Sequence, residues 1–138
     1  MLIQPDTFDR IKELSCLSTA IYAEARNQSE LGQRLVAEVI LNRVDSPRFA
    51  GTICGVVYQP YQFSFVRDIN AQKALEAFTA EVPSKEVLTA IKVAKRAIAR
   101  PRSERMVGNH YHTVSIKPVW SKKMKPAAVV QDHVFYAE

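Results

Sequence analysis

The chain has 138 residues, of which 47% are hydrophobic and 24% are charged. These values indicate one globular domain, residues 1–138, with a hydrophobic core, and they exclude a low-complexity chain. No apolar run reaches the roughly 18 residues of a membrane-spanning helix, so we expect no stable insertion into a membrane. The net charge of +5 favours an anionic partner, such as a nucleic acid, an acidic membrane surface or a bacterial wall polymer.

The basic residues are spread along the chain and do not alternate with aromatic residues as in a single-strand binding platform. We therefore expect no nucleic-acid partner. We also expect the protein to be a monomer. The N-terminal residues lack a basic stretch followed by an apolar one, so no signal peptide is expected and the protein is predicted to be made in the cytoplasm.

Two helices are predicted in the first third of the chain. Asp6 or Thr7 can cap a helix that runs to about Arg26, and Ser29 is a typical N-cap for a second helix that ends near Val44. Such a pair forms a helical hairpin or corner. The side chains predicted to be buried are Phe8, Ile11, Leu14, Leu17 and Ile21 in the first helix and Leu31, Leu35, Val36, Val39 and Ile40 in the second.

The middle of the chain is predicted to hold short helices over residues 52–58 and 71–79, with an ordered loop over residues 59–65. A longer helix is predicted from Ser84 to about Arg100. Its inward side chains are expected to be Val87, Leu88, Ile91, Ala94 and Ile98.

The last third is predicted to contain strands. Residues 109–113 and 129–136 have the composition of two paired strands, joined by a long connection rich in lysine. The predicted fold is therefore α+β: a mainly helical domain with a small C-terminal antiparallel hairpin or sheet. Cys16 and Cys54 lie far apart without metal-site spacing, and we expect them to be free, buried thiols rather than a disulfide.

Glu24 is the first candidate for chemistry, because it continues the apolar stripe that runs through Leu17 and Ile21. Burying a carboxylate is costly unless it is used or paired. A carboxyl group in a partly apolar cleft has a raised pKa, as a general acid requires. The alternative is a structural ion pair with Arg26 or Arg43, and the spacing leaves both interpretations open.

The loop over residues 59–65 combines aromatic faces with side chains that form hydrogen bonds, as sugar-binding sites do. Tyr61, Gln62 and Ser64 are the candidates for a sugar groove. The alternative is a loop held to the core by its aromatic residues, and Phe63 and Phe65 fit that role better.

The three histidines form another candidate site. His110 and His112 point to the same face of an extended strand, and His133 across a hairpin could complete a three-nitrogen zinc site with Glu24 as base. In the alternative, one histidine is a core residue and the others line the rim of a cleft. That cleft wall would contain Tyr111, His112 and His133, with no metal.

A glycosidase commonly uses two carboxylates. Asp45, Asp68 and Asp132 are possible partners of Glu24, but none has a revealing position. If Glu24 acts alone, it can serve first as acid and then as base. A hydroxyl group of the substrate then traps the sugar cation, which makes the reaction a transglycosylation.

Several motifs occur together in one order. They include the run Glu24-Ala25-Arg26 and lie within residues 20–26, 32–44, 49–58, 62–64, 109–112, 118–120 and 133–136. This set resembles the cell wall hydrolase family of the spore cortex-lytic enzymes. The resemblance implies a lysozyme-like fold and a lytic transglycosylase that needs no cofactor. It also implies cleavage between N-acetylmuramic acid and N-acetylglucosamine of peptidoglycan glycan strands, 1,6-anhydro products, and Glu24 as the catalytic residue.

The chain departs from that family at one point, because Asn27 and Gln28 stand where many members carry a second acid. If that second acid assists catalysis in other members, this chain has no residue at the same place that could do so. A catalytic domain without an export signal or a wall-binding domain fits a phage or prophage endolysin. We therefore expect action on the cell wall after release through a membrane lesion. The alternatives are a zinc-dependent peptidoglycan amidase or peptidase that uses His110, His112 and His133, and a non-catalytic wall-binding module.

Overall fold

The structure is a computed structural model that describes residues 5–59 and 76–137. Its elements, in chain order, are α1 (Pro5–Ala25), α2 (Glu30–Val44), α3 (Ile53–Val57), α5 (Lys85–Ala99), the 3-10 helix η2 (Arg102–Glu104), β1 (Tyr111–Thr113), the 3-10 helix η3 (Val119–Lys123), β2 (Pro126–Val130) and β3 (His133–Tyr136). Residues 76–79 are also helical. Within the described residues, no helix is long and apolar enough to cross a membrane. The predicted α+β fold, mainly helical with a small antiparallel sheet, is confirmed.

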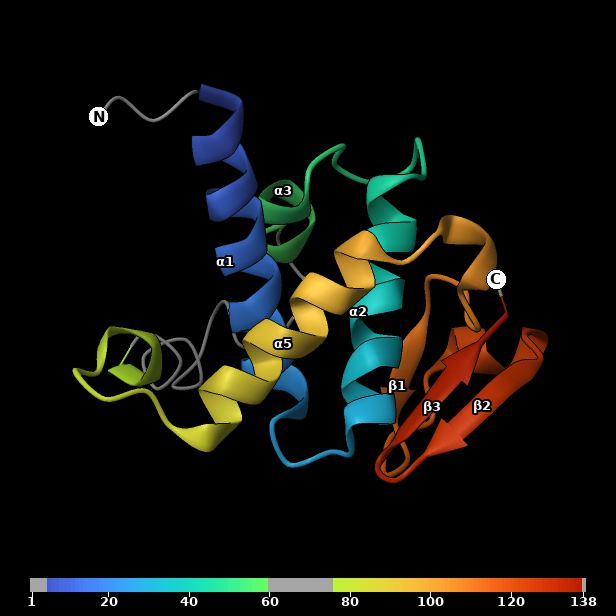
Figure 1. Ribbon diagram of the computed structural model, residues 1–138. Coiled ribbons are helices and arrows are strands. Elements are labelled where there is room, and N and C mark those ends of the chain that lie inside the picture. The colour runs from blue at the N-terminus through green and yellow to red at the C-terminus, as the bar shows by residue number, and fades with distance from the viewer. Residues whose placement is uncertain (1–4, 60–75, 138) are drawn as a thin grey trace.

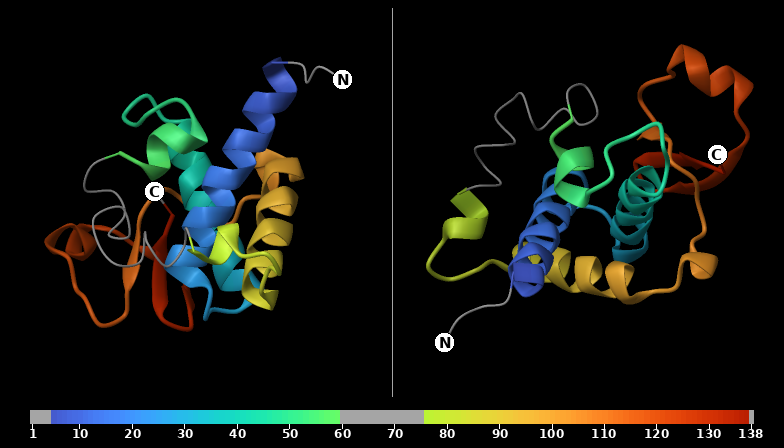
Figure 2. Two further views of the ribbon diagram at one scale, coloured as in Figure 1. Left: turned by 90° about the vertical axis from the view of Figure 1, so that its left-hand side faces the viewer. Right: turned by 90° about the horizontal axis from the view of Figure 1, so that it is seen from above.

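The helices form one part of the molecule and the sheet another (Figures 1 and 2). Helix α5 packs across both α1 and α2, and α3 packs against the same two helices. The sheet lies beside α2, on the side away from α1 (Figure 2). Helix α2 is therefore the central element, since it contacts α1, α3 and α5 and also lies beside the sheet (Figure 2).

Side-chain caps set the helix starts that the sequence predicts. Ser29 Oγ accepts a hydrogen bond from the Gly32 amide at 3.1 Å, and Ser84 Oγ accepts one from Val87 at 3.2 Å. Each cap satisfies a backbone N–H that has no partner within its helix. The second and the longer late helix thus begin where the sequence places them.

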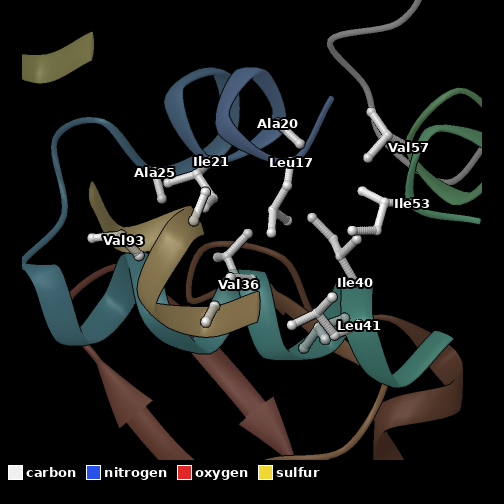
Figure 3. Close-up of a cluster of buried hydrophobic side chains, with 14 of the residues drawn as sticks. Leu17, Ala20, Ile21, Ala25, Val36, Ile40, Leu41, Ile53, Val57 and Val93 are labelled. Carbon is white, nitrogen blue, oxygen red and sulfur yellow. The ribbon is translucent and has the colours of Figure 1, made fainter. Parts of the chain in front are cut away.

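The core lies where α1, α2, α3 and α5 meet (Figure 3). Its fully buried residues include Leu17 and Ile21 of α1, Val36 and Ile40 of α2, and Val57 of α3. Of the predicted stripe of α1, Leu17 and Ile21 are buried, whereas the prediction is wrong for Ile11, which is 53% exposed. Leu31, at the start of α2, is also exposed. The side chain of Phe8 lies outside the described part of the structure. Helix α1 begins at Pro5, so the prediction of Asp6 or Thr7 as its cap is wrong.

The buried face of α5 is only partly the one predicted, because Val87 and Ala94 are buried as expected but other predicted residues are not. Leu88 and Ile98 are 53% and 47% exposed, so their prediction as inward residues is wrong. The buried side chains are smaller: Val87, Ala90, Val93, Ala94 and Ala97. Small residues let α5 approach α1 and α2 closely, and this packing overrides the preference of Leu and Ile for the interior.

The sheet has the strand order β1-β3-β2, with both pairs antiparallel. The single strand predicted over residues 129–136 is in fact parts of two strands, because the chain turns at Gln131 and Asp132. Gln131 has φ 48° and occupies the left-handed region that a tight turn requires. Opposite β3, Tyr111 pairs with Phe135 and Thr113 with His133.

The cysteines are paired, and the expectation of free thiols is wrong. Cys16 of α1 and Cys54 of α3 form a disulfide with a Cα–Cα distance of 5.2 Å. They are 38 residues apart in the sequence, and only the packing of α3 onto α1 brings them together. The disulfide joins these helices two turns before Glu24.

Candidate functional site

Glu24 lies in the last turn of α1, where the helical part of the molecule meets the sheet. Glu24 as a whole is half-buried, and its Oε1 atom is fully buried. Tyr111 of β1 forms a side-chain hydrogen bond with Glu24, and Arg43 of α2 lies close enough to interact with it electrostatically. Three elements that are distant in the sequence thus meet at one carboxyl group.

Tyr111 reaches Glu24 because the chain that enters β1 is fixed to α2. Asn42 Nδ2 donates hydrogen bonds to the carbonyl oxygens of Val107 and Gly108, at 2.8 and 2.9 Å. The Tyr111 ring stacks on Phe135 with 5.5 Å between centroids. Burial, and then the Glu24 carboxylate, raise the pKa of Tyr111 well above 10.0, so its hydroxyl group remains a hydrogen-bond donor to Glu24.

Arg43 provides a buried positive charge beside Glu24. It is 7% exposed, its Nε donates to the Asn109 carbonyl oxygen at 2.9 Å, and its guanidinium lies over the Phe49 ring. Burial lowers the pKa of Arg43, and electrostatic interactions with Tyr111 and Glu24 oppose that shift. Of the two cations considered for Glu24, Arg43 is thus an electrostatic partner. Arg26 folds back onto its own helix and donates to the carbonyl oxygens of Tyr22 and Ala23.

His133 lies on the same face of the sheet as Tyr111, and their rings meet edge to face at 5.2 Å. It is 3% exposed. Burial lowers the pKa of His133, and the neighbouring Asp132 carboxylate opposes this shift. Of the three side chains predicted to form one wall, the structure therefore brings together Tyr111 and His133.

His112 does not belong to that wall, because neighbouring residues of a strand point to opposite faces. Its Nε2 atom forms a 2.7 Å hydrogen bond with the Tyr136 hydroxyl group, and its ring contacts Trp120. His110 also contacts Trp120, so these two histidines share a face as predicted. With His133 on the other face, the three histidines cannot converge on one zinc ion, and no metal-binding group occurs among the described residues. The zinc hypothesis is wrong on geometry.

A hollow of about 200 Å³ adjoins Glu24. It is lined by Ala23, Glu24, Arg26, Asn27, Gln28 and Asp132. Among the described candidates for a second carboxylate, Asp132 alone shares this hollow. Asp45 instead accepts a 2.7 Å hydrogen bond from Arg105, at the opposite end of α2.

A larger hollow, with a volume of about 590 Å³, lies elsewhere, between the first half of α1, α3 and the end of α2. Two of its carboxylates have structural partners: Glu13 accepts hydrogen bonds from the backbone amides of Ile53 and Cys54, and Asp45 pairs with Arg105. The third, Asp9, is exposed on the first turns of α1. Glu24, which is half-buried beside Tyr111 and Arg43, remains the better candidate.

Tyr61, Gln62 and Ser64 lie outside the described residues, as does Asp68. Their predicted roles stay predictions. No local sequence pattern indicates the contact of Gln28 with the β2–β3 turn, because this contact joins residues 104 positions apart.

Comparison with known proteins agrees with this architecture. A model of the cell wall hydrolase family matches residues 27–136. The chain belongs to the cell wall hydrolase family. The family match begins after Glu24, so it does not bear on the role of that residue.

Spore cortex-lytic enzymes and solved SleB catalytic domains resemble this cell wall hydrolase. Spore cortex-lytic enzymes of Bacillus cereus and Bacillus subtilis are 43% and 34% identical over 56 and 85 residues, which are 41% and 55% of this chain. The matched parts are only 22% and 28% of those relatives. The crystal structure of the catalytic domain of the Bacillus cereus SleB protein has a TM-score of 0.70 and 26% identity, covering 91% of this chain and 90% of that chain. The catalytic domain of the germination-specific lytic transglycosylase SleB from Bacillus anthracis has a TM-score of 0.67 and 27% identity, covering 90% and 93%.

Proposed function

We propose that this protein is a peptidoglycan-degrading glycosidase of the lytic transglycosylase type. It would cleave the bond between N-acetylmuramic acid and N-acetylglucosamine in glycan strands and leave 1,6-anhydro-muramic ends, without a cofactor. Family membership and the likeness to a domain named as a lytic transglycosylase support this proposal. The observation that carries it is Glu24, a half-buried carboxyl group between Tyr111, Arg43 and a hollow.

In the first step, Glu24 donates its proton to the glycosidic oxygen, and the bond from that oxygen to C1 of the muramic acid breaks. Its half-buried position beside the hollow lets the acid reach a bound glycosidic oxygen. The carboxylate that forms is stabilised by the hydrogen bond from Tyr111 and by the charge of Arg43. The site therefore holds a group that can release a proton to a bound substrate.

In the second step, the 6-hydroxyl oxygen of the same muramic acid bonds to C1, and its proton passes to Glu24. The acid is thus regenerated without water, and one carboxyl group suffices for both proton transfers. We further propose that the enzyme is released through a membrane lesion and then acts on the cell wall.

The test is mass spectrometry of the fragments released from purified peptidoglycan. We expect muropeptides with anhydro ends from the wild type and almost none from Glu24→Gln. If the released fragments carried ordinary reducing ends, the reaction would be hydrolysis and not transglycosylation. Tight wall binding by both proteins without any release would mean a non-catalytic binding module and would overturn the proposal.

A further inference from the structure

The β2–β3 turn is attached to the loop between α1 and α2 by a two-point contact. Gln28 Nε2 donates to Asp132 Oδ2 at 2.9 Å, and the Asp132 backbone amide donates to Gln28 Oε1 at 3.1 Å. The Ser29 amide also donates to Gln131 Oε1. Two bonds between one pair of residues fix the position and the orientation of the Asp132 carboxylate relative to the end of α1.

The turn is held from the side of the sheet as well. The Val114 amide donates to the Asp132 carbonyl oxygen at 2.8 Å, and Gln131 adopts a left-handed backbone conformation that directs the chain through the turn. The backbone of Asp132 therefore has little freedom. Its side chain is exposed, so it is positioned without being removed from solvent.

The partner of the Asp132 carboxylate is a neutral amide. Among the described residues, Asp132 forms no ion pair, whereas Asp45 pairs with Arg102 and Arg105. A salt bridge would neutralise the charge of a carboxylate, but the Gln28 amide orients it and leaves the charge in place. The loop itself contributes no acid, because Asn27 and Gln28 follow Arg26.

Asp132 and Glu24 line the same hollow, one from the sheet and the other from α1. The proposed reaction develops positive charge on C1 and on the ring oxygen as the glycosidic bond breaks. An ionised carboxylate that is already oriented beside the general acid stabilises such charge without reorganising. The arrangement thus supplies what a lone Glu24 lacks.

We propose that Asp132 is the second carboxylate of the site, that it stabilises the cationic sugar in the transition state, and that Gln28 positions it. This inference rests on the proposed glycosidase function. Asp132 exchanges no proton in this scheme, because Glu24 both gives the proton to the leaving oxygen and recovers one from the 6-hydroxyl group. All atoms of the reaction are thus accounted for without a co-reactant.

The test compares Asp132→Asn with the wild type on soluble glycan strands. Asparagine can still accept the Gln28 hydrogen bond, so we expect normal folding, an unchanged KM and a kcat lowered about 10- to 100-fold. Asp132→Glu restores the charge and should recover part of kcat. Gln28→Leu removes the positioning amide and should lower kcat less than Asp132→Asn does.

Asp45→Asn is the matched control, because it neutralises an aspartate at the other end of α2 and should leave kcat unchanged. An unchanged kcat in Asp132→Asn would overturn the inference while leaving the glycosidase function intact. A loss of kcat that follows a loss of folded protein, measured by thermal unfolding, would also overturn it, since the role would then be structural. Failure of the wild type to release fragments would instead refute the proposed function.

Discussion

Glu24 and Glu38 are both glutamates on the helices that form the core, but their surroundings differ. Glu38 is 1% exposed, and protein groups occupy both of its oxygens. Arg34 Nε donates to Oε2 at 2.8 Å, and the amides of Met106 and Val107 donate to Oε1 at 2.6 and 3.3 Å. Glu24 is only half-buried and borders a hollow. A buried carboxylate surrounded by donors stabilises the fold, whereas one that faces a hollow can meet a substrate.

The largest expected effect is the loss of activity in Glu24→Gln. Glutamine keeps the shape of the side chain but cannot donate the proton, so the rate of fragment release should fall about 10³-fold. The free energy of unfolding in urea should change by no more than about 1 kcal/mol. Full activity in a folded variant would refute the acid role.

Loss of the Cys16–Cys54 disulfide should affect stability and leave the chemistry intact. Closing a chain segment of this length limits the unfolded ensemble, so reduction should cost about 3–4 kcal/mol of unfolding free energy. Urea unfolding with and without a reductant measures this cost, and Cys16→Ala with Cys54→Ala is the matched double variant. Below the unfolding transition, the reduced protein should retain its turnover rate. An unchanged transition midpoint would contradict the stabilising role.

Glu38→Gln makes the same chemical change as Glu24→Gln at the structural carboxylate. Glutamine has only one side-chain oxygen, so its NH2 group faces either Arg34 or the amides of Met106 and Val107, and those donors lose their acceptor. We therefore expect about 2–3 kcal/mol of destabilisation in urea. Specific activity per folded molecule should remain. If this variant were stable but inactive, the distinction between the two glutamates would fail.

Tyr111→Phe tests how much the hydrogen bond from the Tyr111 phenol contributes to catalysis by Glu24. It removes the hydrogen bond and keeps the ring on Phe135, so kcat should fall about 10-fold, equivalent to ~1.4 kcal/mol, while KM changes little. Steady-state kinetics on soluble glycan strands measures both parameters. A changed KM with a normal kcat would assign Tyr111 to substrate binding instead.

The smallest effect concerns the pH dependence at His133. Burial lowers the pKa of His133 below 6.5 in the folded protein, so the unfolded chain binds more protons as the pH falls through about 6.5. Stability should therefore decrease on acidification. The difference in unfolding free energy between pH 7.5 and 5.5 should be smaller in His133→Gln, which retains the other two histidines. An identical difference in both proteins would exclude this contribution.

Much of the helical part follows from local sequence. Ser29 and Ser84 cap helices through hydrogen bonds to amides three residues ahead, and the apolar spacing before Glu24 depends only on neighbouring turns. These signals lie within a few residues, so the sequence alone determined where α2 and α5 begin and which acid lies at the end of α1. Leu88 and Ile98 of α5 were mispredicted as inward because the small residues of α5 become buried only through contact with α1 and α2.

The tertiary structure alone decided how distant residues meet. It paired Cys16 with Cys54, separated His133 from the other two histidines by the strand register, and brought Asp132 into the Glu24 hollow. Each result depends on the packing of elements up to 104 residues apart, on which local periodicity carries no information. The sequence thus determined that Glu24 is a candidate catalytic acid, and the fold decided which residues surround it.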